Sequence, residues 1–247
     1  MVVAIVAAGG QGSRLGGGVP KQFLELGGRP ILARSVEALA ACARIARIVV
    51  ALPAGYAANP PAYLSAWGDR LQVVEGGARR QDSVANAAGA AGDAEIVVVH
   101  DAARPFVDVA TIERVIDAAA SGGAAIAAMP ARDTVKLAHV TETAWVGGEF
   151  GEPLPAVQPK PVPRVKRTLP RDEVFLAQTP QAFRRDVLER VLELGAQGAE
   201  GTDEAALAEQ AGCPVLLVPG DERNIKITTP ADLAFARGLL LERGETV

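Results

Sequence analysis

Short β-branched runs alternate along the chain with longer Ala-rich stretches. Runs of this length suit strands, and the Ala-rich stretches suit helices. The alternation is typical of a parallel sheet covered by helices, so we expect an α/β sandwich. The expected strands are residues 2–8, 45–51, 72–75, 96–100, 124–129 and 215–219. The expected helices lie near residues 31–41, 82–92, 109–121, 184–194 and 202–210, and a last one runs from Thr229-Pro230 to about residue 243.

One stretch interrupts this alternation. Residues 137–170 hold short apolar pieces followed by a basic run with a proline at 153, 155, 159, 161 and 163. That proline spacing excludes a helix and disfavours a central strand. We therefore expect a single domain over residues 1–247 in which residues 137–170 form a protruding arm or insert. This segment could be a solvent-exposed loop or an arm that reaches a second subunit, and the sequence leaves both interpretations possible.

Composition narrows the class of protein. The chain has 247 residues, 49% hydrophobic and 22% charged, which fits one large globular domain. Its apolar runs are shorter than the ~18–20 residues of a membrane helix, and residues 2–8 lack the basic segment of a signal peptide. Two cysteines far apart exclude a disulfide framework, so we expect a cytoplasmic protein.

Charge and histidine content narrow the chemistry. The net charge of −4 argues against nucleic acid as the main partner. With 2 histidines, a multi-histidine metal site or a histidine-driven acid–base mechanism is disfavoured. The chemistry is therefore expected to use Lys, Arg, Asp, Thr and the backbone.

The first expected strand ends in a glycine-rich loop that carries cations. Glycines directly after a buried strand let backbone N–H groups approach phosphate oxygens. The loop lacks the third glycine of the dinucleotide fingerprint and the Gly-Lys-Ser/Thr of a P-loop. Arg14 and Lys21 instead flank its glycines, which suits a triphosphate attacked at its α-phosphorus. A plain surface turn with solvated charges is the alternative.

A second expected strand also ends in charge, at His100-Asp101-Ala102-Ala103-Arg104. Open α/β sheets bind ligands at the carboxyl ends of their strands, where Asp101 could hold Mg²⁺ and Arg104 a substrate phosphate. A surface ion pair between the two is the alternative. Cations or hydroxyls also stand in three further loops, at 132–136, at 171–181 and at 224–228. Each of these alone is equally typical of a solvated loop.

Together these segments resemble the 2-C-methyl-D-erythritol 4-phosphate cytidylyltransferases of the non-mevalonate isoprenoid pathway. Eight landmarks occur in order over nearly the whole chain. They are Ala8-Gly9-Gly10-Gln11-Gly12-Ser13-Arg14-Leu15, Pro20-Lys21-Gln22, Asp82-Ser83-Val84, His100-Asp101-Ala102-Ala103-Arg104-Pro105, Asp133-Thr134-Val135-Lys136, Thr179-Pro180-Gln181, Thr202-Asp203-Glu204-Ala205 and Asn224-Ile225-Lys226.

The resemblance implies a Rossmann-like nucleotidyltransferase fold, a homodimer joined through the arm, and CMP transfer from CTP to the methylerythritol phosphate with Mg²⁺. It implies CTP-binding roles for Ala8, Gly9, Gly10, Gln11, Gly12, Gly76, Gly77, Ser83 and Asp101, with Asp101 beside the metal. It implies catalytic roles for Arg14, Lys21 and Lys226. It implies that Arg104, Thr134, Arg171 and Thr179 hold the second substrate.

Other readings of the same features stay open. The Ala8-Gly9-Gly10 start of the loop is also similar to ribitol-5-phosphate cytidylyltransferases, and few loop positions would separate the two substrates. A catalytically idle nucleotide-binding scaffold is a further alternative, which the presence of Lys21, Arg14, Asp101 and Lys226 disfavours. We expect no fused cyclase domain within these residues.

Overall fold

The computed structural model describes residues 1–10, 19–139 and 163–246. The predicted site residues Gln11, Gly12 and Arg14 lie outside them. The chain divides into two compact units, one formed by Met1–Ala128 with Ala177–Val247 and the other by Met129–Leu176. No helix in the described ranges is both long and apolar enough to cross a membrane.

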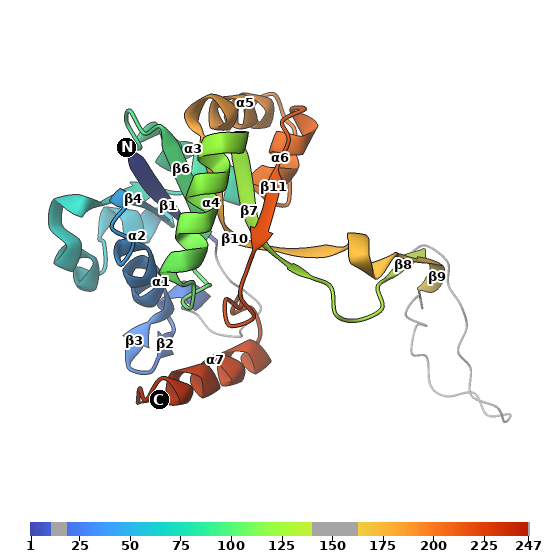
Figure 1. Ribbon diagram of the computed structural model, residues 1–247. Coiled ribbons are helices and arrows are strands. Elements are labelled where there is room, and N and C mark those ends of the chain that lie inside the picture. Colours follow the sequence, from blue (N-terminus) through green and yellow to red (C-terminus); the bar gives the residue numbers. More distant parts are fainter. Residues whose placement is uncertain (11–18, 140–162, 247) are drawn as a thin grey trace, which may run out of the picture. The chain divides into compact units, whose positions relative to one another are not determined.

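The first unit is built on a seven-stranded sheet with the order β11-β7-β10-β6-β1-β4-β5 (Figure 1). Strand β1 pairs in parallel with β4 and β6, as does β4 with β5 and β11 with β7, while β10 runs antiparallel to β6. The mostly parallel sheet expected from the sequence is confirmed. The strands are β1 (Val2–Ala7), β4 (Ile45–Leu52), β5 (Leu71–Glu75), β6 (Ile96–Asp101), β7 (Ala124–Pro130), β10 (Phe175–Arg184) and β11 (Leu216–Pro219).

Helices cover both faces of this sheet because alternate residues of each strand point to opposite sides. In β1, Ala4 and Val6 pack with one apolar cluster, to which α1 and α4 contribute, whereas Val3 and Ile5 pack with a second cluster that includes α3, α5 and α6. Both faces of the sheet are therefore covered by apolar side chains, as is typical of a parallel sheet. The helices are α1 (Ile31–Ala40), α3 (Arg80–Gly89), α4 (Val109–Gly122), α5 (Arg185–Ala196) and α6 (Glu204–Gln210).

A third apolar cluster fixes the C-terminal helix α7 (Pro230–Glu242). Thr229 caps α7 by accepting a hydrogen bond from the N–H of Asp232, as its Thr-Pro start predicts. Ile227, just before the helix, is fully buried in the same cluster and donates its N–H to the Ala103 carbonyl at 2.8 Å. The segment that carries Lys226 is thereby pinned beside the end of β6.

Strand β10 corrects the sequence interpretation, which treated residues 178–181 as loop. The sequence pattern did not predict a strand here, because proline and buried polar groups are both unusual inside a sheet and this segment has Pro180 and three polar neighbours. The structure provides partners for those polar groups: Gln181 donates to Asp203 at 2.8 Å, and Thr179 contacts His100 at 3.1 Å. The remaining short elements are β2 (Glu25–Leu26), β3 (Arg29–Pro30), α2 (Ala54–Ala58) and the 3₁₀ turns η2 (Lys21–Phe23), η3 (Ala62–Arg70) and η4 (Arg171–Glu173).

The second unit contains a two-stranded antiparallel ribbon of β8 (Lys136–His139) and β9 (Arg164–Thr168). The Leu169 N–H extends it by donating to the Val135 carbonyl at 3.0 Å. Most of the prolines of the expected arm, from 153 to 161, lie outside the described residues.

Candidate active site

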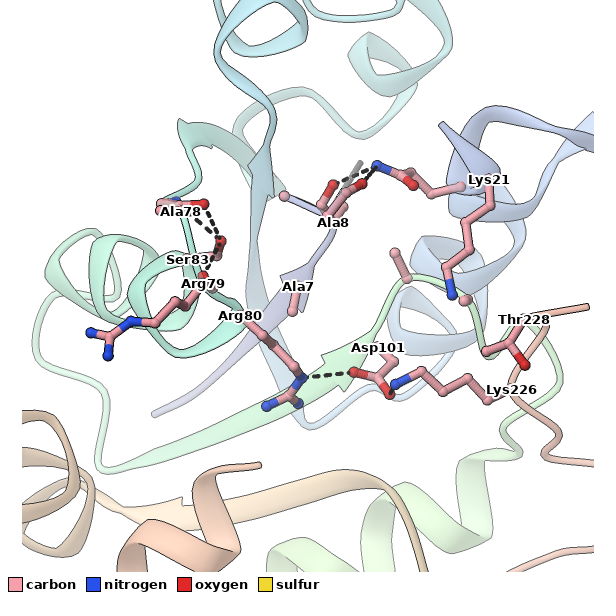
Figure 2. A pocket seen from close by; sticks show the side chains of 16 residues that line it. Ala7, Ala8, Lys21, Ala78, Arg79, Arg80, Ser83, Asp101, Lys226 and Thr228 are labelled. Atoms are coloured by element: carbon pink, nitrogen blue, oxygen red, sulfur yellow. Dashed lines mark hydrogen bonds and ion pairs between the residues drawn. The ribbon is translucent and has the colours of Figure 1, made fainter. Parts of the chain in front are cut away.

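A cavity of about 520 Å³ lies where β1 and β6 end (Figure 2). These two strands pair in register, with Ala7 opposite Asp101, so the residues that follow Ala7 meet Asp101 at one edge of the sheet. The lining includes Ala8, Gly9, Gly10, Lys21, Gln22, Gly77, Arg79, Arg80, Ser83, Asp101, Lys226 and Thr228. This is the edge at which open α/β sheets bind ligands.

Two glycine-containing loops form one wall of the cavity and pack against each other. A Cβ on Gly76 would lie 3.1 Å from the Gly9 Cα, and one on Gly9 would lie 2.5 Å from the Ser83 Oγ. Ser83 ties the second loop together, since its hydroxyl accepts from the Gly77 N–H at 3.1 Å and donates to the Arg79 carbonyl at 3.1 Å. Glycine is therefore needed at both contact points.

Asp101 is the centre of the charged wall. Its carboxylate lies 2.8 Å from the Lys226 Nζ, 3.1 Å from the Arg80 Nε and 3.7 Å from the Arg104 Nε, and the residue is only 6% exposed. Burial would raise the pKa of Asp101, but Arg80, Lys226 and Arg104 outweigh it and hold that pKa well below its usual range. The carboxylate is thus ionised at neutral pH, and the alternative of a surface ion pair is excluded by its burial.

Arg80 joins Asp101 to a second buried carboxylate. Its guanidinium contacts Glu204 at 2.5 Å as well as Asp101, and Glu204, at the start of α6, is 1% exposed. Burial would lower the pKa of Arg80, yet the two carboxylates outweigh it and raise that pKa above its ordinary value. Arg80 therefore stays charged in a largely buried position and fixes the first turn of α3 against the cavity (Figure 2).

Lys21 and Lys226 approach the cavity from different elements. Lys21 lies in η2, and its Nζ donates to the Ile227 carbonyl at 3.1 Å, next to Lys226 in the chain. Figure 2 shows the Lys21 side chain pointing toward the segment that carries Lys226 and Thr228. The Lys226 ammonium is held at Asp101 and the Lys21 ammonium at the neighbouring Ile227 carbonyl, and both side chains line the same cavity, which is an arrangement suited to a polyanion.

Thr179 and His100 hold the backbone of Asp101 through a chain of hydrogen bonds. The His100 Nε2 lies 2.9 Å from the Arg104 carbonyl, which can only accept, so Nε2 carries the proton and Nδ1 accepts from the Thr179 hydroxyl. The same hydroxyl oxygen accepts the Asp101 N–H at 3.0 Å. Burial lowers the pKa of His100 to about 4, so the imidazole is neutral and holds the backbone of Asp101 in place.

The structure brings most of the predicted site residues of the first unit together. Eight of them line the cavity: Ala8, Gly9, Gly10, Lys21, Gly77, Ser83, Asp101 and Lys226. Gly76 packs behind that wall, and Arg104 and Thr179 contact Asp101 from outside it. Thr134 and Arg171 belong to the second unit, where both are exposed and Arg171 donates to the Arg132 carbonyl at 3.1 Å. Their predicted role in holding the second substrate stays a prediction.

Sequence reasoning missed Arg80 and Glu204. Arg80 stands between Gly77 and Ser83, where adjacent arginines look like solvated charges, and Glu204 looks like an acidic residue in the first turn of a helix. The available signal for Arg80 was its position after the loop that follows β5, whereas Glu204 follows the loop after α5 and had no such signal.

The cavity offers limited protein ligands for a divalent cation. Asp101 is the only carboxylate among the described lining residues, and no cluster of three His, Cys, Asp or Glu side chains occurs in the described part of the chain. Mg²⁺ commonly binds one or two carboxylates and completes its shell with phosphate oxygens and water. One buried, ionised aspartate at a polyanion site therefore fits Mg²⁺ that arrives with a nucleotide.

A mostly parallel sheet with a glycine-walled, cation-lined cavity at its strand ends is typical of the Rossmann-like fold of nucleotidyltransferases. Comparison with known proteins identifies the family. Residues 2–148 and 156–242 match the model of the family described as IspD: 2-C-methyl-D-erythritol 4-phosphate cytidylyltransferase. The chain belongs to this family, and the resemblance seen in the sequence is confirmed.

Individual relatives agree with this assignment. The chain is 48% identical over 240 residues to the bifunctional enzyme IspD/IspF of Anaeromyxobacter dehalogenans, covering 97% of this chain and 57% of that one. It therefore spans little more than half the length of such bifunctional relatives. It is 39% identical to the 2-C-methyl-D-erythritol 4-phosphate cytidylyltransferase of Geobacillus kaustophilus, with 97% of each chain covered. The crystal structure of the Thermus thermophilus enzyme of that name matches with a TM-score of 0.72 at 34% identity, covering 96% of this chain and 97% of that one.

Proposed function

We propose that the chain transfers the cytidylyl group of CTP to the phosphate of 2-C-methyl-D-erythritol 4-phosphate. An oxygen of that phosphate attacks the α-phosphorus of CTP, the bond from the α-phosphorus to the bridging β-oxygen breaks, and pyrophosphate leaves. The products are 4-diphosphocytidyl-2-C-methyl-D-erythritol and pyrophosphate. The observation that carries the proposal is that four cations and one carboxylate line a single cavity in a chain of this family.

The reaction needs alignment and charge stabilisation and no protein nucleophile. Lys21 and Lys226 line the same cavity, and we assign both to the phosphates of the nucleotide. We assign Arg14 the same role from its place in the sequence. Each cation favours the transition state by countering charge that builds on the α-phosphate and the leaving pyrophosphate. The wall that contains Gly9, Gly10 and Gly77 has no Cβ at these positions, so the nucleotide can lie close to the backbone.

Asp101 has two roles in this proposal. It holds Lys226 in place before the nucleotide binds, and it is the carboxylate to which Mg²⁺ is assigned. The ion would supply charge neutralisation on the triphosphate. Asp101 would hold the ion together with the phosphates of the nucleotide, while Arg80, Arg104 and Lys226 pair with its carboxylate in the structure described here.

We also propose a cytoplasmic homodimer in which the second unit forms the arm. Its support is the exposed apolar surface of that unit: Val165 is 63% exposed, Leu176 57% and Phe175 45%. Surface of this kind marks an interaction site. Light scattering during size exclusion would give the mass of a dimer for the unchanged protein, and Val165→Lys is expected to shift it toward the monomer. A monomer at all concentrations would reject this part of the proposal.

The test of the activity is pyrophosphate release by the folded protein with CTP and Mg²⁺, run in parallel with methylerythritol 4-phosphate and with ribitol 5-phosphate. Release with the first alone is expected. Release with ribitol 5-phosphate alone would reject the proposed substrate and keep the nucleotidyl transfer. No pyrophosphate release with either substrate, while CTP still binds, would favour the nucleotide-binding scaffold.

A further inference from the structure

Gln22 is a buried side chain of the cavity that the proposed mechanism leaves without a role. It lies in η2 directly after Lys21, and only 2% of it is exposed. Its side-chain amide donates two hydrogen bonds, to the Ala8 carbonyl at 2.7 Å and to the Gly10 carbonyl at 3.0 Å. Both hydrogens of the amide are thereby used.

These two bonds fix the start of the glycine-rich loop. In a trans peptide the C=O and the N–H point in opposite directions, and the Ala8–Gly9 bond is not among the cis bonds of the described chain. With the Ala8 carbonyl turned toward Gln22, the Gly9 N–H faces the other way. The Ala8 N–H is already held by the Ala51 carbonyl at 3.0 Å, so Ala8 is fixed on both sides.

Glycine makes such an external restraint necessary. Gly9 and Gly10 have no Cβ to limit their backbone, so without a restraint these two residues would lose considerable conformational entropy when they order around an anion. A donor pair that bridges residues 8 and 10 removes part of that cost before the ligand arrives. The bridge also ties the loop to the turn that carries Lys21.

We propose that Gln22 is a positioning residue for nucleotide binding: its amide clamps the Ala8 and Gly10 carbonyls and so presets residues 8–10 and the neighbouring Lys21 for the triphosphate. This inference rests on the proposed function for the identity of the nucleotide. It makes Gln22 act through the backbone and through Lys21, without contact to the reacting atoms.

Two variants separate this role from general stability. Gln22→Met keeps the side-chain length and removes both donors, and kcat/KM for CTP is expected to fall about tenfold or more, since the buried Ala8 carbonyl and the Gly10 carbonyl both lose this partner. KM for the second substrate, measured at saturating CTP, is expected to stay within twofold. The matched control is Gln210→Met, an exposed glutamine that donates to the Glu200 carbonyl at 3.0 Å outside the cavity, and it is expected to leave all constants unchanged.

Gln22→Glu gives a pH signature that a merely structural role would not produce. A neutral carboxyl can donate one hydrogen bond to a carbonyl, whereas the carboxylate donates none and repels both oxygens. The variant's kcat/KM for CTP, divided by that of the unchanged protein at each pH, is therefore expected to fall severalfold as pH rises from 5.5 to 8.5. The ratio to the unchanged protein is used because other charged groups line the same cavity, among them Lys21, Asp101 and Lys226.

Binding of CTP with Mg²⁺ by calorimetry keeps the two proposals distinguishable, because it does not depend on turnover. If the unchanged protein binds CTP without releasing pyrophosphate, the proposed function fails while weaker binding by Gln22→Met still supports the clamp. A Gln22→Met variant that binds CTP within twofold of the unchanged protein would overturn the clamp, and so would a ratio for Gln22→Glu that is flat with pH. If Gln22→Met does not fold, the pH ratio, measured in binding or turnover, decides alone.

Discussion

Arg80 gives the sharpest stability prediction because it separates two buried carboxylates. Its guanidinium contacts Glu204 at 2.5 Å and Asp101 at 3.1 Å, while its own side chain is 25% exposed. Removing one partner of a buried ion pair costs about 3–5 kcal/mol, since the other charge is left uncompensated. Asp101 keeps Lys226 and Arg104, so the loss falls mainly on Glu204, and we expect Arg80→Met to cost about 3 kcal/mol at pH 8.

The cost is expected to depend on pH in one direction. Burial raises the pKa of Glu204 in the folded protein, against the opposing effect of Arg80, and the substitution removes that opposition. A carboxyl with a raised folded-state pKa contributes most below its unfolded pKa, and that contribution is lost as pH rises through the folded value. The difference between Arg80→Met and the unchanged protein is therefore expected to be larger at pH 8 than at pH 5.

Urea unfolding at pH 5, 6.5 and 8 measures this difference, and a loss of about 3 kcal/mol corresponds to a melting temperature lower by about 6–12 °C for a domain of this size. Glu204→Gln in the same chain is expected to restore about 2 kcal/mol, which makes the pair non-additive. The control is Arg185→Met, whose partner Glu189 lies 2.7 Å away but is 60% exposed, with an expected cost below about 0.5 kcal/mol. A cost for Arg80→Met below about 1 kcal/mol at pH 8, or strict additivity with Glu204→Gln, would refute the reasoning.

Three further predictions concern the cavity and its support. Lys21→Ala is expected to lower the rate of pyrophosphate release by roughly a hundredfold or more with an unchanged melting temperature, and near-normal turnover would remove Lys21 from the mechanism. Gly9→Ala is expected to raise KM for CTP because its Cβ would lie 2.5 Å from the Ser83 Oγ, and adding Ser83→Ala is expected to relieve the clash; a failure of that rescue would contradict it. Because the folded-state pKa of His100 is lowered to about 4 from 6.5, its contribution is lost as pH falls between those values, so unfolding of the unchanged protein is expected to show about 3 kcal/mol of pH dependence that His100→Gln lacks.

The sequence predicted the parts of the fold that repeat a simple period. Buried parallel strands such as β1 and β6 are nearly continuous apolar runs, and the capped start of α7 is readable from Thr229-Pro230. Strand β10 could not be read in this way. Its polar residues are buried because His100, Asp203 and Asn224, all distant in sequence, provide hydrogen-bond partners.

The candidate site also contains both residues that a local pattern predicts and residues whose role depends on distant contacts. Asp101 and the glycines were visible because each directly follows a predicted strand, and the topology of a parallel sheet brings such positions to one edge. Glu204 and Gln22 were not given roles, because what they do depends on a contact 124 residues away in one case and on two backbone carbonyls in the other. The sequence around Glu204 and around Gln22 does not indicate these contacts.

The charge of the whole chain and the charge of the described cavity wall have opposite signs, so the acidic composition is compatible with the proposed binding of a polyanion. The chain carries a formal net charge of −4, whereas the described cavity wall has Lys21, Arg79, Arg80 and Lys226 against the single carboxylate of Asp101. A carboxylate in such a wall lowers the attraction of the wall for phosphate, so we expect Asp101 to have a compensating role. It fills this role by holding Arg80 and Lys226 at 3.1 and 2.8 Å, which keeps like charges together at a site where they would otherwise repel. The aspartate thus stabilises the positive cavity wall in the absence of a ligand, and the proposed nucleotide would compete with it for Lys226, whose side chain is 40% exposed.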